Sequence, residues 1–106
     1  MNLNNLHFYE RSNRYGTELG MRVRGYWVQK STFEQAAKLI EQNQHLLTWE
    51  KPLESRDICR HPDWDTWLVS LRHNIGRCVR YFSEDGMLPL WIVNPEKGGP
   101  RRYMPK

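Results

Sequence analysis

The sequence has few features of a secreted or membrane protein. Two cysteines in 106 residues are too few for a disulfide framework, so we expect reduced thiols. The chain contains no apolar run long enough to cross a membrane, and its first residues do not form a signal peptide. We therefore expect a cytoplasmic protein that does not act on membranes.

Common enzyme and metal-binding motifs are missing as well. There is no phosphate-cradling glycine loop and no Gly-x-Ser-x-Gly nucleophile turn. On a single helix, His73 and Cys78 would lie about 140° apart around the axis, too far for one ion. The four residues of the kind that bind zinc are Cys59, His61, His73 and Cys78. Their spacing also differs from that of paired zinc knuckles. We predict a non-enzymatic protein without catalytic residues, metal ions or other cofactors.

Acidic residues are outnumbered by basic ones. The 16 lysines and arginines oppose 12 acidic residues, which gives a net charge of +4 and a pI of about 9.3. Arginine (11) exceeds lysine (5), and its planar guanidinium suits bidentate contacts to phosphate. The apolar content of 39% is that of a globular chain. We expect one domain, residues 1–106, that favours acidic partners such as nucleic acid.

Residues 63–82 have the apolar spacing of a helix and organise the rest of the chain. A glycine within a helix costs about 1 kcal/mol relative to alanine, which makes Gly76 the weak point of this helix. The alternative is two shorter helices joined by a turn at residues 74–76. The apolar stripe continues through Gly76, which favours one helix. Pro62 suits the first helical position. The predicted stripe contains Trp64, Trp67, Leu68, Leu71, Ile75, Cys78, Val79 and Phe82, and the opposite side carries His73, Arg77 and Arg80.

The first half of the chain predicts two strands and a helix. Residues 6–9 and 21–28 alternate as strands do, and residues 10–20 have the composition of a loop. A capping box from Ser31 to Glu34 predicts a helix that begins there and ends near Leu47. In the second strand, Met21, Val23 and Trp27 are expected on one face, and Arg22, Arg24 and Tyr26 on the other.

The remaining segments complete an α+β prediction. Residues 48–62 are expected to form a connector, residues 90–93 a buried strand, residues 94–100 a loop and residues 101–104 a last strand. The predicted architecture is a small antiparallel sheet, in ββααββ order, packed against two helices.

One segment resembles a known family of regulators. Residues 75–103 contain Arg80-Tyr81-Phe82, Gly86-Met87-Leu88-Pro89 and Gly99 followed by Arg101-Arg102-Tyr103. This segment resembles the helix and wing of MerR-type regulators, which implies an arginine helix in the major groove. The loop of the wing is longer here, and the apolar stripe opposes a turn at Gly76, so we assign no family.

The leading hypothesis is a non-enzymatic basic protein that binds nucleic acid. Arginines occur with aromatic residues in three clusters, a mixture that serves phosphate contact and base stacking. The clusters are Arg22/Arg24/Tyr26, Arg77/Arg80/Tyr81 and Arg101/Arg102/Tyr103. We expect DNA rather than RNA, in a regulatory or accessory role. The candidate nucleic-acid-binding residues are Arg22, Arg24, Tyr26, His73, Arg77, Arg80, Arg101, Arg102 and Tyr103.

Two other functions fit the same composition. The first is a protein-binding inhibitor or adaptor, as in small phage and plasmid proteins that target a host enzyme or nucleoprotein complex. Its anchors would be Trp27, Trp49 and Trp91, and a homodimer is also compatible with the sequence. The second is a small metal-independent ribonuclease, whose phosphate-directed groups are of the right type but show no convergent spacing. These groups are His7, Tyr9, Arg22, Arg24, Arg101, Arg102 and Tyr103.

Overall fold

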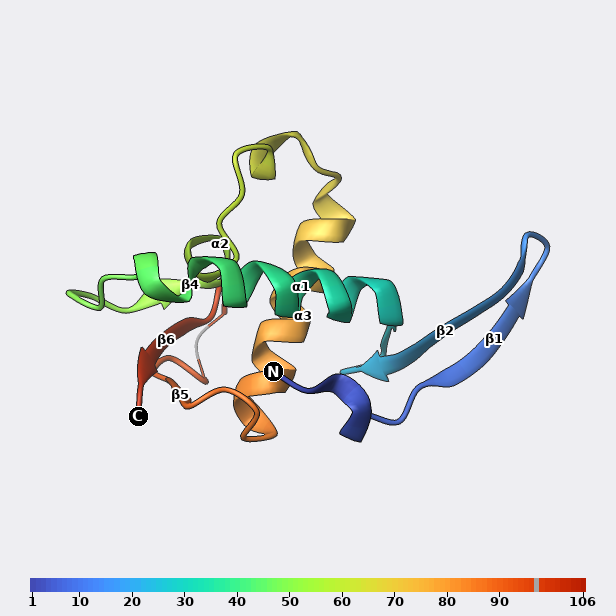
Figure 1. Cartoon of the computed structure of the whole chain (residues 1–106), viewed down its shortest axis with the longest axis horizontal. Helices are drawn as coiled ribbons and strands as arrows, with labels where there is room; N and C mark the ends of the chain where they lie inside the picture. Colours follow the sequence, from blue (N-terminus) through green and yellow to red (C-terminus); the bar gives the residue numbers. More distant parts are fainter. Residues whose placement is uncertain (97) are drawn as a thin grey trace.

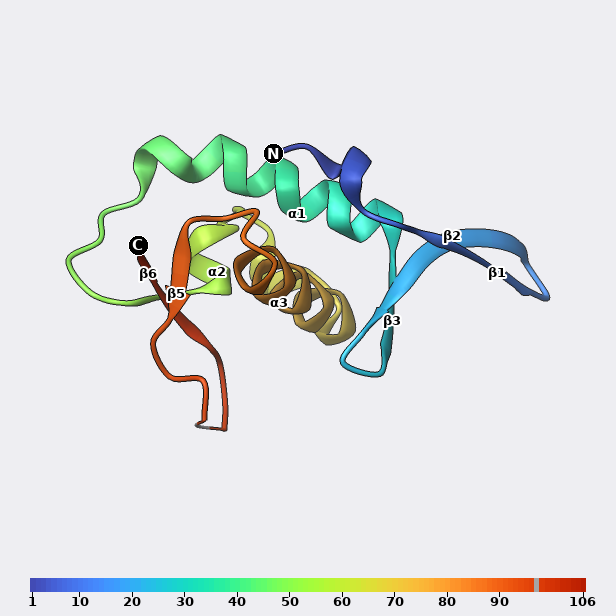
Figure 2. The same ribbon diagram turned by 90° about the horizontal axis from the view of Figure 1, so that it is seen from below.

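Two three-stranded antiparallel sheets lie on opposite sides of a central helix in the computed structural model (Figures 1 and 2). The structure describes residues 1–96 and 98–106. With η denoting a 3-10 helix, the elements are η1 (Leu3–Asn5), β1 (Tyr9–Asn13), β2 (Gly16–Val23), β3 (Tyr26–Gln29), α1 (Lys30–Asn43), η2 (Gln44–Leu46), β4 (Leu53–Glu54), α2 (Ser55–Ile58), η3 (Trp64–Thr66), α3 (Val69–Glu84), β5 (Leu90–Ile92) and β6 (Arg102–Pro105). The α+β class with antiparallel sheets is confirmed.

The strands form two sheets rather than the single sheet expected. Strands β1, β2 and β3 form one meander, and the other sheet has the order β4-β6-β5. Strand β4 and helix α2 lie within residues 48–62, which were expected to be a connector. Their junction is closed by a reciprocal capping box between Glu54 and Asp57, in which the Glu54 N–H donates to Asp57 Oδ2 at 3.0 Å. A two-residue strand is too short to show alternation in the sequence.

Helix α3 is unbroken across Gly76, so the single-helix prediction is confirmed. The helix begins at Val69, however, and not at residue 63. Trp64 belongs to the 3-10 turn η3, Trp67 has extended backbone, and Leu68 is 76% exposed. The apolar stripe therefore extended past the real helix start, because Trp64 and Trp67 pack against the core without belonging to the α-helix. The buried side of α3 consists of Ile75, Cys78, Val79, Phe82 and Ser83.

A long hairpin occupies the segment expected to be a loop. Strands β1 and β2 pair from Tyr9 with Gly20 to Asn13 with Gly16, and this arm projects away from the body (Figure 1). All five β1 residues are exposed, so neither face of the arm required the apolar alternation that marks a half-buried strand. The predicted strand at 6–9 was wrong apart from Tyr9.

A second turn reverses the predicted faces of residues 26 and 27. Arg24 and Gly25 both have left-handed backbone (φ 52° and 85°), the geometry of a tight two-residue hairpin turn. Strand β3 therefore returns along β2, and Trp27 pairs with Arg22 while Tyr26 pairs with Val23. The sequence prediction treated residues 21–28 as one strand and placed Trp27 with Val23, which was wrong.

Helix α1 packs across α3 and supplies five buried apolar residues of the core, namely Phe33, Ala36, Ala37, Leu39 and Ile40. Its expected capping box is absent: α1 begins at Lys30, and the Ser31 hydroxyl donates to Gln29 Oε1 instead. The helix ends at Asn43 and continues as η2 to Leu46, close to the predicted end. Phe33 lies fully buried against Phe82 of α3, with ring centroids 5.8 Å apart.

The two C-terminal strands pair as predicted, but residues 90–93 are not the buried strand expected: Leu90 is buried, whereas Trp91 and Val93 are exposed because this short strand covers the core with one face only. Strand β5 pairs with β6 in an antiparallel register that includes Trp91 with Met104. Asn94 holds the entrance to β6, because its Nδ2 donates to the Pro100 carbonyl at 3.0 Å and its Oδ1 accepts the Arg102 N–H at 2.6 Å. Residue 97 of the loop predicted at 94–100 lies outside the described residues. No helix in the described part of the chain combines the length and hydrophobicity needed to span a bilayer.

Replacing Gly20 should destabilise the first sheet. A Cβ at this position would lie 2.4 Å from the Val28 carbonyl oxygen and 2.9 Å from the Trp27 ring. We expect Gly20→Ala to lower the free energy of unfolding by about 1–3 kcal/mol, as overpacking does. The control is Gly98→Ala, since a Cβ on Gly98 meets nothing within 4 Å. Thermal unfolding midpoints that are equal in the two variants would contradict this prediction.

The buried thiols should make the protein less stable in alkali. Cys59 and Cys78 are free and fully buried; burial raises the pKa of Cys59 to about 12 and also raises that of Cys78. Unfolded thiols ionise from about pH 8.5, so the unfolded chain loses protons that the folded chain keeps. The free energy of unfolding should fall between these pH values by up to about 1.4 kcal/mol per pH unit and thiol.

Urea unfolding under reducing conditions at pH 8 and pH 10.5 measures this decline. Cys59→Ala should show a shallower decline than the wild type, whereas Lys and Tyr ionisation affects both proteins alike. An identical pH dependence in the two proteins would show that the thiol is not responsible.

Candidate nucleic-acid interface

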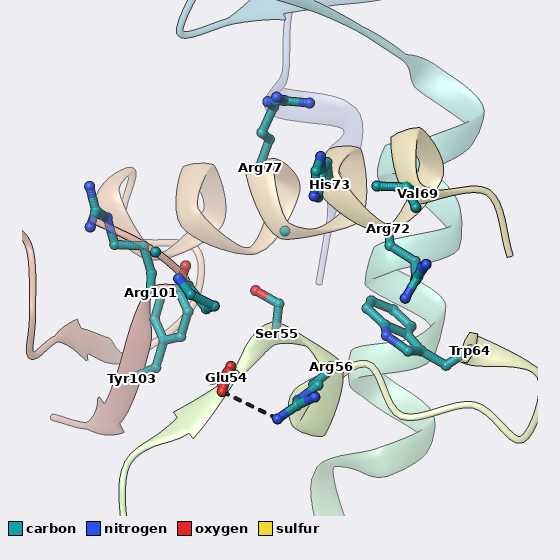
Figure 3. A pocket seen from close by; sticks show the side chains of 13 residues that line it. Glu54, Ser55, Arg56, Trp64, Val69, Arg72, His73, Arg77, Arg101 and Tyr103 are labelled. Atoms are coloured by element: carbon teal, nitrogen blue, oxygen red, sulfur yellow. Dashed lines mark ion pairs between the residues drawn. The ribbon is translucent and has the colours of Figure 1, made fainter. Parts of the chain in front are cut away.

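A groove of about 660 Å³ runs beside α3 (Figure 3). Helix α3 forms one wall, and the opposite wall comes from α2, the end of β4 and the residues that lead into β6. Trp64 of η3 lies at one end. The lining residues are Glu54, Ser55, Arg56, Trp64, Val69, Arg72, His73, Gly76, Arg77, Gly99, Pro100, Arg101 and Tyr103.

The groove has a strong excess of positive charge. Four arginines and a histidine line it. Arg56 comes from α2, Arg101 from the residues that lead into β6, and α3 supplies Arg72, His73 and Arg77. Among the described residues that line it, Glu54 is the one carboxylate, and Arg56 lies 3.7 Å from it. Since one negative charge faces four guanidinium groups, the groove is suited to an anionic ligand.

The helical period of α3 places its groove residues together. Positions 69, 72, 73, 76 and 77 follow the spacing of one helix face. Gly76 stands where α3 approaches α2, because a Cβ on it would lie 3.6 Å from Ser55 Oγ. That is an ordinary contact distance, so a larger residue would not be excluded by steric clash. The absence of a side chain at Gly76 keeps the floor of the groove open between Arg72 and Arg77.

Tyr103 lies beneath the floor of the groove. Its side chain is fully buried, and the hydroxyl faces Ser55 across the floor (Figure 3). Burial raises the pKa of Tyr103 to about 12; the neighbouring Ser55 hydroxyl opposes this shift, although it is not placed for a well-formed hydrogen bond. Tyr103 is therefore a neutral hydrogen-bond donor at physiological pH, and its ring is inaccessible for the base stacking that its sequence context suggested.

Two of the predicted clusters meet at Arg77. Its guanidinium lies 3.6 Å from the centroid of the Tyr26 ring and donates to Asn74 Oδ1 at 2.6 Å. Tyr26 thus supports a groove arginine from the first sheet, at a distance typical of a cation–π contact. The structure brings His73, Arg77 and Arg101 into one groove, with Tyr103 beneath its floor and Tyr26 at its edge.

Arg24 and Arg80 share a single carboxylate. Arg24 Nη2 lies 2.7 Å and Arg80 Nε 2.5 Å from Glu84 Oε1. Partial burial tends to raise the pKa of Glu84, but the hydrogen bonds from both guanidiniums lower it below its ordinary value. The contacts hold the β2–β3 turn against α3 and neutralise part of the local charge. Both arginines therefore have a structural role, and the binding role predicted for them stays a prediction.

Arg22 and Arg102 lie outside the groove. Arg22 donates to the Gly25 carbonyl at 3.2 Å and stabilises the tight turn of its own hairpin. Arg102 is exposed on β6, in register with Glu54 of β4. The three arginine-and-aromatic clusters are thus only partly combined, since these two side chains do not line the hollow.

The three tryptophans predicted as interface anchors do not form one patch. Trp27 is half-buried beneath Arg11, whose guanidinium carbon lies 4.5 Å from the ring centroid. Trp49 is half-buried and lines a separate apolar hollow of about 280 Å³ beside α1 and β5. Trp91 is 59% exposed on β5, in the other sheet from Trp27 and across α3 from it (Figure 2).

The groups proposed for a ribonuclease are separated. His7 and Tyr9 contact each other at the base of the projecting arm, with ring centroids 4.5 Å apart. Tyr103 belongs to the other sheet, across α3, and Arg101 immediately precedes that strand. Among the described residues, no three histidine, cysteine or acidic side chains come together as metal ligands.

Sequence reasoning missed three groove residues. Arg56 was placed in a connector, although the acidic residues at 54 and 57 carried the signal of a helix start. Trp64 was assigned to the apolar stripe of a helix that begins later. Arg72 lies on the flank of the helix, between the apolar stripe and the side opposite it, so its position indicated neither burial nor ligand binding. All three line the groove.

Comparisons with known proteins give no match. No family model fits the chain, and neither a curated protein nor a solved structure is significantly similar to it. The groove geometry is therefore the basis for any functional proposal.

Proposed function

We propose that this protein binds nucleic acid, with DNA as the expected ligand, and that the groove beside α3 holds the phosphate backbone. The observation that carries the proposal is the convergence of Arg56, Arg72, Arg77 and Arg101 on one hollow with a single carboxylate. Guanidinium groups bind phosphate oxygens through paired N–H donors, and several of them in one groove can follow a backbone.

The surroundings of two arginines support a binding role. The Nε atom of Arg72 has no hydrogen-bond partner among the described residues, and no carboxylate there forms an ion pair with Arg72, so its charge is not neutralised within the protein. Arg77 is held over Tyr26 and by Asn74, which reduces the entropy lost when it binds. These features favour a groove that is already arranged for an anion.

The proposed activity is binding without catalysis. The groove carboxylate, Glu54, lies beside Arg56, and its side chain also caps the N-terminus of α2. Tyr103 is fully buried beneath the groove and shapes its floor without contacting the ligand. The groove is thus dominated by groups that attract and position an anion.

A protein-binding function is the second candidate, and exposed apolar side chains favour it. Trp91 is 59%, Leu68 76% and Val69 54% exposed. Tryptophan is a frequent anchor of protein interfaces. If this candidate were correct, Trp91→Ala would weaken capture of a stoichiometric partner from a lysate treated with nuclease, whereas Arg72→Gln would leave capture unchanged.

DNA affinity should depend on salt and on the groove arginines. We expect a fluorescently labelled oligonucleotide to bind at about 50 mM salt and to lose affinity steeply toward 200 mM, because bound phosphates release counterions. Arg72→Gln and Arg101→Gln should each weaken binding and reduce the slope of log K against log salt by roughly 1. Fluorescence anisotropy titrations over this salt range measure both effects.

Arg14→Gln is the matched control, since it removes the same charge from the exposed turn of the β1–β2 arm. It should change the slope much less than the groove variants do. Equal losses from Arg14→Gln and Arg72→Gln would assign binding to net charge rather than to the groove. No measurable binding to any oligonucleotide at 50 mM salt would refute the proposed function.

A further inference from the structure

We infer that the groove accepts a single strand rather than a duplex, with one base stacked on Trp64. This inference rests on the proposed nucleic-acid function and narrows its ligand. It follows from the shape of the basic surface and from an aromatic side chain that the sequence reasoning placed in the core.

The basic side of α3 lies in a hollow. Beyond one side of the helix stands the β2–β3 turn, fixed by the contacts of Arg24 with Glu84 and of Arg77 with Tyr26. On the other side stand α2 and the residues before β6, and in Figure 2 the β2–β3 turn and the chain that leads into β6 extend past α3 in the same direction.

A helix that reads duplex DNA has to project, because the major groove is about 12 Å wide and surrounds the inserted helix. Here α3 forms a wall of the groove, with flanking segments on both sides. A duplex is a stiff convex rod and would meet those flanks first. A single strand is narrow and flexible, so its phosphates can reach Arg72, Arg77 and Arg101 inside the groove.

Trp64 is placed to receive a base at the end of this groove. Its indole lies beside Arg72 in the groove wall (Figure 3) and also lines a neighbouring hollow of about 470 Å³. Trp67 packs near it, with ring centroids 5.6 Å apart, and His61 lies 4.7 Å from Trp67. The indole is therefore supported from within the protein while its outer part remains accessible.

Aromatic side chains next to arginines are the general means by which proteins hold single strands. Bases stack on the rings, and the cations follow the phosphates. Trp64 and Arg72 provide this combination side by side, and the exposed Leu68 and Val69 extend the apolar surface at the same end. Single-stranded DNA has unpaired bases available for stacking, whereas a duplex keeps them within its own stack.

The first experiment compares a labelled 12-nucleotide oligothymidylate with a 12-base-pair duplex by anisotropy at 50 mM salt. We expect the single strand to bind roughly 10-fold or more tightly than the duplex, as one or two stacked bases would provide. Equal or tighter binding of the duplex would overturn the inference and leave the proposed function intact. If neither oligonucleotide binds, the proposed function itself fails.

The second experiment tests Trp64 directly. Trp64→Leu should weaken single-strand binding by roughly 5-fold or more, and Trp64→Phe should restore most of it, because a phenyl ring still stacks. Trp91→Leu removes an exposed indole outside the groove and should have no effect. Equal losses in the Leu and Phe variants would contradict stacking.

A measurement on the wild-type protein does not depend on how the variants fold. Oligothymidylate containing 5-iodouracil, irradiated in the complex, should crosslink to the peptide that contains Trp64. Crosslinks confined to other tryptophan-containing peptides would overturn the assignment of Trp64.

Discussion

Burial of the apolar side of α3 against α1 is the interaction on which the rest of the structure depends. Phe33 meets Phe82 edge to face, and both are inaccessible to solvent, as are Ile75 and Val79. Full burial of each such side chain contributes about 1.5–3 kcal/mol. Neither sheet could stand alone, because a three-stranded sheet needs an apolar face to pack on. With the apolar side buried, the basic side of α3 necessarily faces outward, and the two sheets determine what surrounds it.

The periodic parts of the fold could be predicted from sequence, because their signals are local. The α3 stripe through Ile75, Cys78 and Phe82 repeats at helical spacing, and it outweighed the helix-breaking tendency of Gly76. Strand β5 is a short apolar run bounded by Pro89 and Asn94, which is also a local signal. The helix start was misplaced because Trp64 and Trp67 pack against the core from a 3-10 turn and an extended segment. Apolar spacing alone cannot distinguish that arrangement from another helical turn.

The groove could not be predicted, because it depends on contacts between residues far apart in the chain. Pairing of β4 with β6 brings Arg56 and Arg101 to the same hollow, and a two-residue strand leaves no readable pattern. The attachment of Arg24 to Glu84 joins positions 60 residues apart. The left-handed conformation of Arg24 could not be predicted either, because it is uncommon for a residue other than glycine. The turn that contains Arg24 reverses the faces assigned to Tyr26 and Trp27.

The distribution of charge matters more for the proposed function than the net charge of +4. In 0.1 M salt an exposed charge is largely screened beyond about 10 Å, so a ligand responds mainly to charges close to it. Near the β2–β3 turn, Glu84 offsets one of the two cations it contacts, and those arginines hold the hairpin in place. Within the groove, a single glutamate faces four arginines. Arginine therefore has two roles in this protein, and the carboxylates around it determine which. Arg24 and Arg80 hold the β2–β3 turn against α3, whereas the arginines of the groove give that hollow its positive charge.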